Sequence, residues 1–385
     1  MPSDGSRVQV EFAADFRDVG ADLWRRCFPP PLEGQFWYRA LEHSGLEEQF
    51  AFRYGVLRRG GETVGIVPCF VHDVSIALVA PRPVALLLRV LSRVFPRAGR
   101  QRTFFVGSPC SDEGSVGLLP GVNLAEVAPE LIRALRAEAR RLGAPMIVFK
   151  DFPEAASAAL DAPARAAGFF GVVSYPGTVL ALPSPDRGAY LRGLSSMQRH
   201  NFLKKLRRSR ERLALETSVV ERPSDRELEE IHGLFRQTYE KGATKFERLG
   251  PPFFRAVAGE EPARFILQRD PATGALLTFM LVFCLGDRVI NKFIGIDYRR
   301  AGATYLYFRL FDAALDFAYA RGARELQSGQ TGYRAKLDLG HRLVPLHNLV
   351  RHQNRLVHAV YRMIGARVTW KTLDSDLATF LLAHP

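Results

Sequence analysis

The stretch between residues 264 and 328 restricts the possible folds of this chain more than any other. Three apolar runs separated by glycine-containing turns predict three consecutive strands, at 264–268, 276–285 and 288–298. A long segment with apolar residues at helical spacing follows at 304–319, and a short apolar run at 325–328 predicts one more buried strand. This order predicts a mixed, mostly antiparallel sheet flanked by helices.

The length of the chain predicts two domains. A chain of 385 residues exceeds one average hydrophobic core, and its 47% hydrophobic and 24% charged residues are ordinary for a soluble globular protein. The turn-rich Pro-Ser-Pro at 183–185 marks the expected boundary, which gives domains at 1–182 and 183–385. Each part runs from a hairpin through a helix to a buried strand. The expected fold class is therefore α/β (α+β), with two tandem domains of one kind.

The net charge of +13 indicates an anionic partner. A phosphorylated cofactor, a nucleic acid and an anionic lipid surface all fit, and the charge does not choose among them. The four cysteines are spaced too widely for a zinc knuckle and are typical of reduced thiols. The C-terminal histidines stand six, five and six residues apart, at His341, His347, His352 and His358. These separations do not place two imidazoles on one helix face, so no metal site is predicted.

The apolar segments predict no membrane-spanning helix. The longest clean apolar run, 276–285, is far shorter than the ~20 residues that a bilayer requires. The segment 76–95 is apolar but interrupted by three arginines, so it predicts a packed helix, with a helix on a membrane surface as the less favoured alternative. The first ten residues contain no apolar signal sequence, so we expect a cytoplasmic location.

The junction between the third strand and the long helix is a candidate anion site. The strand ends at Tyr298, the link contains Arg299 and Gly302, and the helix is expected to begin at Thr304. Unpaired N–H groups and the positive end of the helix dipole face the same point at such a junction. Two neighbouring arginines add positive charge, and this combination suits a pyrophosphate.

This segment resembles the acyl-CoA-binding core of the GNAT acyltransferases. Their loop reads Gln/Arg-x-x-Gly-x-Gly/Ala, and Arg299 and Gly302 occupy its first two fixed positions, whereas Thr304 stands where the family has Gly or Ala. The resemblance implies an N-acyltransferase that uses acetyl-CoA or another acyl-CoA as donor, without a metal. It implies a donor site formed by Arg299, Arg300, Gly302, Ala303 and Thr304.

A basic helical segment at 190–212 carries a second resemblance. Its pattern Leu-Ser-Ser-x-x-Arg-x-Asn-x-x-x-Lys-x-Arg is similar to the segment that opens the second domain of FemAB-like and CelD-like acyltransferases. That family places this region beside the acceptor or donor cleft, which implies substrate contacts for Arg199, Asn201 and Lys205. A solvated basic face is the structural alternative.

The segment 326–340 carries a third resemblance. In the two-lobed family the corresponding strand end is often acidic and precedes a Tyr/Phe-Lys pair, whereas here Gln327 replaces the acid. Tyr333 and Lys336 share a helix face because they lie three residues apart. The resemblance implies substrate contacts for Gln327 and Lys336, and for Tyr239 in the aromatic-rich stretch 239–254. Core packing and an ordinary helix start are the structural alternatives.

Acyl transfer to an amine requires a polarised carbonyl, a deprotonated ammonium and a protonated leaving group. In GNAT folds, backbone N–H groups polarise the carbonyl where neighbouring strands splay, and the resemblance places this function on 291–297. We expect Asp297 to act as the base, either with a pKa raised by burial or through a relayed water. Tyr298 or Tyr333 would return the proton. These three residues are the predicted catalytic groups.

Three functions agree with these patterns. The first is an acyl-CoA N-acyltransferase acting on the amine of a small molecule, sugar or amino acid, with the donor on 183–385 and the acceptor side shaped by 1–182. The second is an aminoacyl-tRNA-dependent transferase of FemAB type, whose basic helix would contact tRNA phosphates. The third is a non-catalytic basic module that binds RNA or an anionic surface, although interleaved exposed aromatics are missing.

Overall fold

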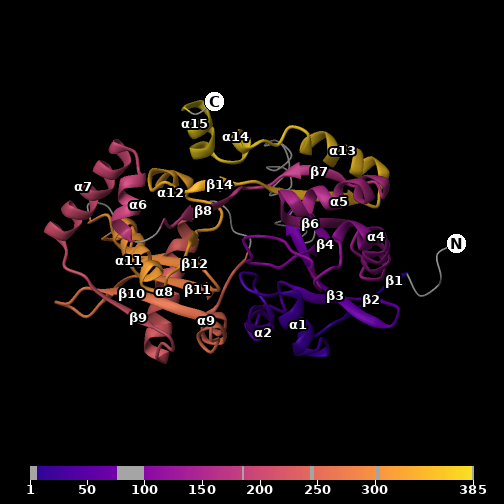
Figure 1. The fold of residues 1–385 in the computed structure, drawn as a ribbon, viewed down its shortest axis with the longest axis horizontal. Helices are drawn as coiled ribbons and strands as arrows, with labels where there is room; N and C mark the ends of the chain where they lie inside the picture. Colours follow the sequence, from indigo (N-terminus) through magenta and orange to yellow (C-terminus); the bar gives the residue numbers. More distant parts are fainter. Residues whose placement is uncertain (1–6, 76–98, 184–185, 243–246, 301–303, 384–385) are drawn as a thin grey trace. The chain divides into compact units, whose positions relative to one another are not determined.

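The computed structural model describes residues 7–75, 99–183, 186–242, 247–300 and 304–383. They group into two compact units, each assembled from three segments of the sequence (Figure 1). The first unit comprises Met1–Phe28, Glu47–Ser174 and Pro345–Leu373, and the second comprises Pro29–Leu46, Tyr175–Val344 and Asp374–Pro385. The apolar segment 76–95 lies outside the described residues. No helix within the described ranges combines the length and apolarity needed to cross a bilayer.

The first unit contains a mixed sheet in the order β1-β2-β3-β4-β6-β15-β7, with β5 paired to β3. Its strands are β1 (Val8–Ala13), β2 (Ala51–Arg59), β3 (Glu62–Ser75), β4 (Arg100–Val106), β5 (Gly117–Leu118), β6 (Met146–Pro153), β7 (Phe170–Val173) and β15 (Leu346–His352). Strands β4 and β6 pair in parallel. The tight β2–β3 turn uses Gly60 and Gly61, whose φ angles of 59° and 85° lie in the region that favours glycine.

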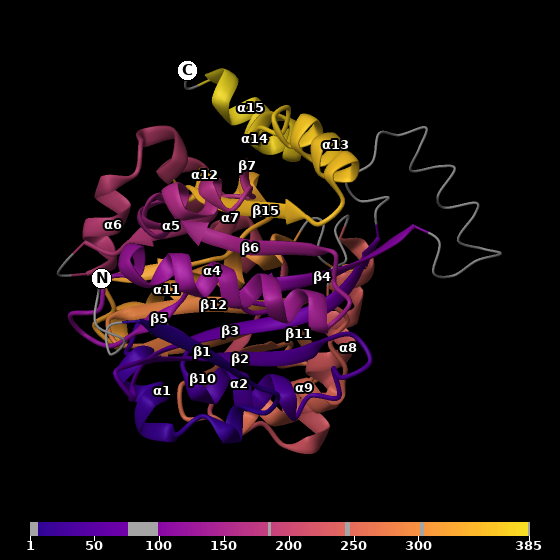
Figure 2. The ribbon, with the colours of Figure 1, turned by 90° about the vertical axis from the view of Figure 1, so that its right-hand side faces the viewer.

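The helices of the first unit are α1 (Ala21–Cys27), α4 (Leu124–Arg141), α5 (Glu154–Ala166), α13 (Arg355–Gly365) and α14 (Trp370–Leu373), with a 3-10 turn at Phe16–Asp18. Helix α4 begins after Asn123, whose side chain accepts a hydrogen bond from the Ala125 N–H. Apolar residues of α4 and α5, including Leu131 and Leu160, form one core with Phe149 of β6. Figure 2 shows α4 lying along this sheet.

The second unit contains a mixed sheet in the order β14-β8-β13-β12-β11-β10-β9. Its strands are β8 (Gly177–Ala181), β9 (Glu216–Val220), β10 (Ala263–Arg269), β11 (Leu276–Leu285), β12 (Arg288–Ile296), β13 (Glu325–Gln327) and β14 (Arg342–Val344). Strands β12 and β13 pair in parallel, and the other neighbouring strands of this sheet pair antiparallel. The strands predicted at 264–268, 276–285 and 288–298 correspond to β10, β11 and β12.

The helices of the second unit are α2 (Gln35–Glu42), α6 (Arg187–Gly193), α7 (Ser196–Arg212), α8 (Asp225–Lys241), α9 (Pro251–Ala258), α11 (Leu306–Ala320), α12 (Tyr333–Asp338) and α15 (Ser375–Ala383). Ser195 and Ser224 start α7 and α8 with reciprocal capping boxes. Leu310 of α11 and Phe202 of α7 share a core with Val282 of β11.

An aromatic core lies where α2, α8 and α9 pack on this second sheet. The Trp37 ring meets Phe253 and Phe283 edge-on at 6.0 and 5.5 Å between ring centroids. The buried Lys292 ammonium pairs with Glu33 and lies 4.6 Å from the centre of the Trp37 ring. The segment 29–46 is therefore part of the core of the second unit, although it precedes most of the first unit in sequence.

The two sheets share one plan. In each, an antiparallel meander of four strands is followed by a parallel neighbour and then by two antiparallel strands. The sheets cut across the expected boundary at 182/183, because β8 pairs in the second sheet and β15 pairs in the first. The predicted fold class is confirmed: two mixed, mostly antiparallel sheets are flanked by helices. The acceptor and donor roles expected of the two parts stay predictions.

Candidate active site

Strands β12 and β13 run side by side only briefly. Their parallel ladder ends at the pair Ile290 and Gln327, whereas β12 continues to Ile296 and stays paired with β11 on its other side. The β11 ladder shifts register between Leu281 and Val282, so β12 carries an extra residue at this point. Within the described ranges, no strand pairs with the β13 side of β12 beyond Ile290.

Backbone amides point out of this open edge. The Asp297 N–H donates to the Leu277 carbonyl, which makes 297 a residue that faces β11. Residues alternate along an antiparallel strand, so Ile294 and Ile296 direct their N–H groups away from β11. The Ile296 N–H accordingly reaches the Thr238 hydroxyl of α8 at 3.3 Å. By the same alternation, the Ile294 amide faces the side of β12 on which β13 has ended.

A buried polar cluster, formed by Asn291, Ser328, Lys336 and His341, lies where the two strands separate. The Asn291 side-chain amide donates to the Ser328 hydroxyl at 3.0 Å, and that hydroxyl lies 3.0 Å from Nε2 of His341. The other imidazole nitrogen, Nδ1, lies 3.0 Å from the Lys336 carbonyl. Because a carbonyl only accepts, we assign the ring proton to Nδ1, and Ser328 then donates to Nε2.

Two features of this polar cluster set its charge. Burial lowers the pKa of His341 to about 3, and the neighbouring positive charge of Lys336 acts in the same direction. His341 is therefore a neutral hydrogen-bond acceptor near pH 7. The Lys336 ammonium is buried and donates to the carbonyls of Ser328 and Gly329. Asn291 Oδ1 is buried and has no hydrogen-bond partner among the described residues.

The predicted residues of the 326–340 segment lie at or next to this polar cluster. Lys336 belongs to it, and Gln327 is the last residue of β13, where its side-chain oxygen accepts from Arg288 at 3.0 Å. Tyr333 is fully buried at the start of α12, and its hydroxyl donates to the Pro176 carbonyl at 2.8 Å.

Asp297 follows β12 directly, but its electrostatics differ from the prediction. Its carboxylate accepts two hydrogen bonds from the Arg299 guanidinium, both at 2.9 Å, and one from the Arg299 backbone N–H at 3.1 Å. The Arg299 side chain lowers the pKa of Asp297 and outweighs the opposing effect of burial. The expectation of a pKa raised by burial is therefore wrong, and Asp297 is an ionised carboxylate.

The loop before α11 is less cationic than predicted. Arg299 is paired with Asp297, and Arg300 donates to Asp270 at 2.9 Å. The backbone hydrogen bond from Ala272, together with this Arg300 contact, lowers the pKa of the Asp270 carboxyl. The Arg299 side chain nevertheless stays 81% exposed, so it remains accessible to a ligand. Gly302 and Ala303 lie outside the described residues.

The long helix α11 begins two residues later than expected, at Leu306. Tyr305 precedes it with a left-handed φ of 49°, which interrupts the helical path between Thr304 and Leu306. The Thr304 hydroxyl donates to the Arg300 carbonyl, so the side chain is used inside the loop. The Thr304 carbonyl accepts from Ser209, which connects this loop to the end of α7.

The three substrate contacts predicted on helix α7 differ in exposure. Asn201 is exposed, whereas Lys205 lies 3.9 Å from the centre of the Phe308 ring and 3.8 Å from Asp338. Arg199 donates to the Leu191 carbonyl at 3.4 Å, close to the base of the helix. Of the three substrate contacts predicted on this helix, Asn201 alone has an exposed side chain.

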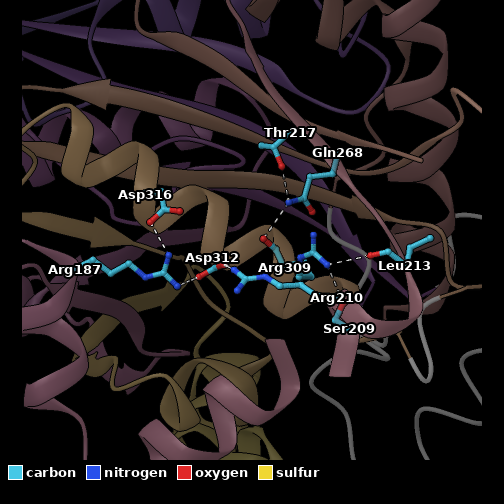
Figure 3. Close-up of polar contacts among 9 residues, drawn as sticks. All are labelled: Arg187, Ser209, Arg210, Leu213, Thr217, Gln268, Arg309, Asp312 and Asp316. Carbon is cyan, nitrogen blue, oxygen red and sulfur yellow. Dashed lines mark hydrogen bonds and ion pairs between the residues drawn. The ribbon is translucent and has the colours of Figure 1, made fainter. Parts of the chain in front are cut away.

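A polar network fixes α7 on α11 (Figure 3). Asp312 lies between the guanidinium groups of Arg187 and Arg210, and Arg187 also reaches Asp316 at 2.8 Å. Arg309 donates from α11 to the Ser209 hydroxyl and to the Leu213 carbonyl, at 3.4 and 3.3 Å. These contacts join the last turn of α7 to the first turns of α11.

The predicted aromatic residues near the loop pack against their neighbours. Tyr239 stacks on Phe235 along α8, with ring centroids 6.2 Å apart. Tyr298 accepts the Lys241 ammonium on its ring face at 3.8 Å.

Sequence reasoning missed Asn291, Ser328 and His341. The histidine spacing bears only on a metal site, and Asn291 and Ser328 lie 37 residues apart in the chain. The available signal was a set of polar residues inside otherwise apolar predicted strands, since buried polar groups require partners. No group of three potential metal ligands occurs in the part of the chain that the structure describes.

Comparisons with solved structures identify similar folds. FemX aligns with a TM-score of 0.59 at 11% identity, covering 92% of this chain and 100% of that chain. A conserved protein of unknown function from Bacteroides thetaiotaomicron VPI-5482 aligns with a TM-score of 0.52 at 11% identity, covering 89% of this chain and 99% of that chain. No protein-family profile and no curated relative matches the sequence. At such low identity these similarities show the fold only, and they confirm the predicted two-domain FemAB-like fold for this chain.

Proposed function

We propose that the chain is an N-acyltransferase that moves an acyl group, such as acetyl, from acyl-CoA to the amine of a small molecule, sugar or amino acid. The open edge of β12 beyond Ile290 is the observation that carries this proposal. A thioester carbonyl placed there would accept a hydrogen bond from the Ile294 amide. That amide is fixed by the β11 ladder, so it would stabilise the developing oxyanion without reorganisation.

The second unit supplies a rigid frame for this chemistry. The buried polar cluster of Asn291, Ser328, Lys336 and His341 fixes the point at which the strands separate. Ionised Asp297 directly follows the same strand, and a water held by its carboxylate would relay the proton from the acceptor ammonium. Tyr298, the next residue, would return a proton to the leaving thiolate.

The acyl-CoA phosphates would bind beside the loop that precedes α11. The exposed Arg299 side chain and the amides at the start of α11 support this placement. Gly302 and Ala303, the remaining members of the predicted donor site, belong to the same proposal. Its acceptor contacts are Arg199, Asn201, Lys205, Tyr239, Gln327 and Lys336.

An aminoacyl-tRNA donor is the second candidate. Arg207, Arg208 and Arg210 of α7 all lie exposed, although Arg207 also pairs with Glu211 and Arg210 with Asp312. Several exposed cations on one helix suit a polyanion such as a nucleic acid, because each can neutralise a phosphate. A tRNA donor would make activity fall steeply with salt and disappear after RNase treatment, whereas an acyl-CoA donor would make it insensitive to RNase.

The experiment compares two substitutions at one residue of the full chain. Ile294→Pro removes the amide hydrogen at a position that does not bond to β11, and Ile294→Val keeps it. We expect acyl transfer from acetyl-CoA to an amine panel to fall on the order of 10²-fold in Ile294→Pro and to stay near wild type in Ile294→Val. Equal activity in the two variants, with both folded, would remove this amide from the mechanism. Absence of any CoA binding by the wild type would overturn the acyl-CoA donor.

A further inference from the structure

Helix α13 of the first unit docks through one face only. Gly365 lies so close to β7 that a Cβ added there would stand 2.8 Å from a Val172 methyl group. The His358 ring packs edge-on against Phe170 with centroids 5.1 Å apart, and His358 Nδ1 accepts from the His352 N–H at 3.2 Å. Strand β7 and the end of β15 therefore cover the inner face of α13. Figure 1 draws α13 beside β7.

The outer face of α13 carries large apolar side chains in the open. Leu356, Val360 and Met363 are 80%, 50% and 56% exposed. Their spacing of four and three residues places them in one stripe along the helix. A helix at a protein surface normally presents polar residues on this side, so a contiguous apolar stripe indicates a binding surface.

Charge identifies the occupant of this stripe. No acidic residue occurs between Asp338 and Asp374, while Arg355 and Arg362 are exposed on the helix, and Arg367 and Lys371 follow it. Two copies of such a face would repel each other, which disfavours a symmetric dimer. An apolar stripe beside guanidinium groups fits a bilayer with anionic lipids, because apolar side chains enter the acyl boundary while arginines reach the phosphates.

We propose that the outer face of α13, formed by Leu356, Val360 and Met363 with Arg355 and Arg362, docks on an anionic lipid surface. The helix lies in the plane of the interface and does not cross it. This association is independent of the proposed acyl transfer, because every residue in it belongs to the first unit. It brings the chain to acceptors or donors located at such a surface.

Sedimentation of the full chain with lipid vesicles tests the proposal. We expect binding to phosphatidylcholine vesicles that contain phosphatidylglycerol, little binding to pure phosphatidylcholine, and weaker binding as salt increases. The double variant Leu356→Ser, Met363→Ser should weaken the partition by about tenfold or more. Both side chains are exposed, so circular dichroism should show an unchanged fold.

Met197→Ser is the matched control. Met197 is 75% exposed on the basic helix α7 and shares no stripe with another apolar residue, so this variant should bind vesicles as the wild type does. A double variant that binds as well as the wild type would overturn the proposal, as would a wild type that sediments with neither vesicle. If the double variant instead dissociates a dimer or a protein complex without vesicle binding, the surface is a protein interface and the lipid assignment is wrong.

Discussion

The hydroxyl of Ser328 lies 3.0 Å from Nε2 of His341, although the two residues are thirteen positions apart in the chain. This contact joins the end of β13 to the residue just before β14, and Asn291 of β12 reaches the same hydroxyl. The Asn291, Ser328 and His341 side chains that meet at this point are all uncharged, and the Lys336 ammonium donates to the neighbouring Ser328 carbonyl. A neutral imidazole at this position has consequences for stability that depend on pH.

Stability should fall as the solution becomes acidic, partly because of His341. Its pKa is lowered to about 3 in the folded chain, so between pH 6.5 and pH 3 the unfolded chain takes up a proton that the folded chain refuses. The contribution of His341 to the free energy of unfolding is complete above pH 6.5. It falls by at most about 1.4 kcal/mol for each pH unit below that value. Urea unfolding of wild type and His341→Gln between pH 7.5 and 4.5 measures this. An equally steep pH dependence in the variant would contradict the assignment.

Asp297 should act as an ionised carboxylate that holds the relaying water, rather than as a base that itself titrates near neutrality. The Arg299 guanidinium lowers the pKa of Asp297, so Asp297→Asn should leave the acid limb of the pH–rate profile in place. The same change should destabilise the fold by about 1 kcal/mol, because the lost charged hydrogen bonds are part-buried and solvent screens them at the 81% exposed Arg299. Asp287→Asn, at an exposed turn, is the control and should change stability little. A shift of the acid limb in Asp297→Asn would restore the general-base assignment.

The packing of α7 on α11 should depend on Asp312. Asp312→Ala removes the carboxylate between Arg187 and Arg210 and should cost about 1–2 kcal/mol, discounted because Arg210 is largely exposed. Asp316→Ala removes only an exposed partner of Arg187 and should cost less than about 1 kcal/mol. Chemical denaturation of both variants provides the comparison. Equal losses would show that the buried position of Asp312 contributes nothing.

Close packing of α8 on β12 should make Gly295 irreplaceable. A Cβ there would stand 2.3 Å from a Phe279 ring carbon and 2.7 Å from Leu234 Cβ. Gly295→Ala should therefore destabilise the second unit by about 1–3 kcal/mol. It should also displace α8, whose Thr238 hydroxyl accepts from the Ile296 N–H. Gly171→Ala is the control, because a Cβ on that strand residue meets nothing within 4 Å. Thermal unfolding of the two variants should separate them clearly, and similar midpoints would refute the packing argument.

Local patterns predicted the fold well where neighbours in sequence are neighbours in the sheet. The apolar runs and glycine turns located β10, β11 and β12 within a few residues, because hairpin strands pair with the next strand along the chain. The pairing of β8 in the second sheet and of β15 in the first was not predictable in this way. Their partners lie more than a hundred residues away in sequence, and a strand pattern does not name its partner.

The candidate site was predicted only in part for the same reason. The resemblance pointed to Gln327 and Lys336. The polar cluster that includes Lys336, however, combines residues of β12 and α12 with the residues that follow β13 and precede β14. The electrostatic error at Asp297 has a different origin. The pKa of a carboxylate depends on which cation lies beside it. The Arg299 side chain bends back to donate to Asp297, two residues earlier, and a sequence pattern does not show this geometry.

Hydrogen–deuterium exchange of the full chain with and without acetyl-CoA tests the central claim most directly. If the donor lies along the open edge of β12, acetyl-CoA should protect the backbone amides of Ile294 and its neighbours, together with the first turn of α11. Amides of β1 and β2 in the first unit should exchange unchanged. Acetyl-CoA that binds without protecting the β12 edge, or that fails to bind at all, would contradict the account.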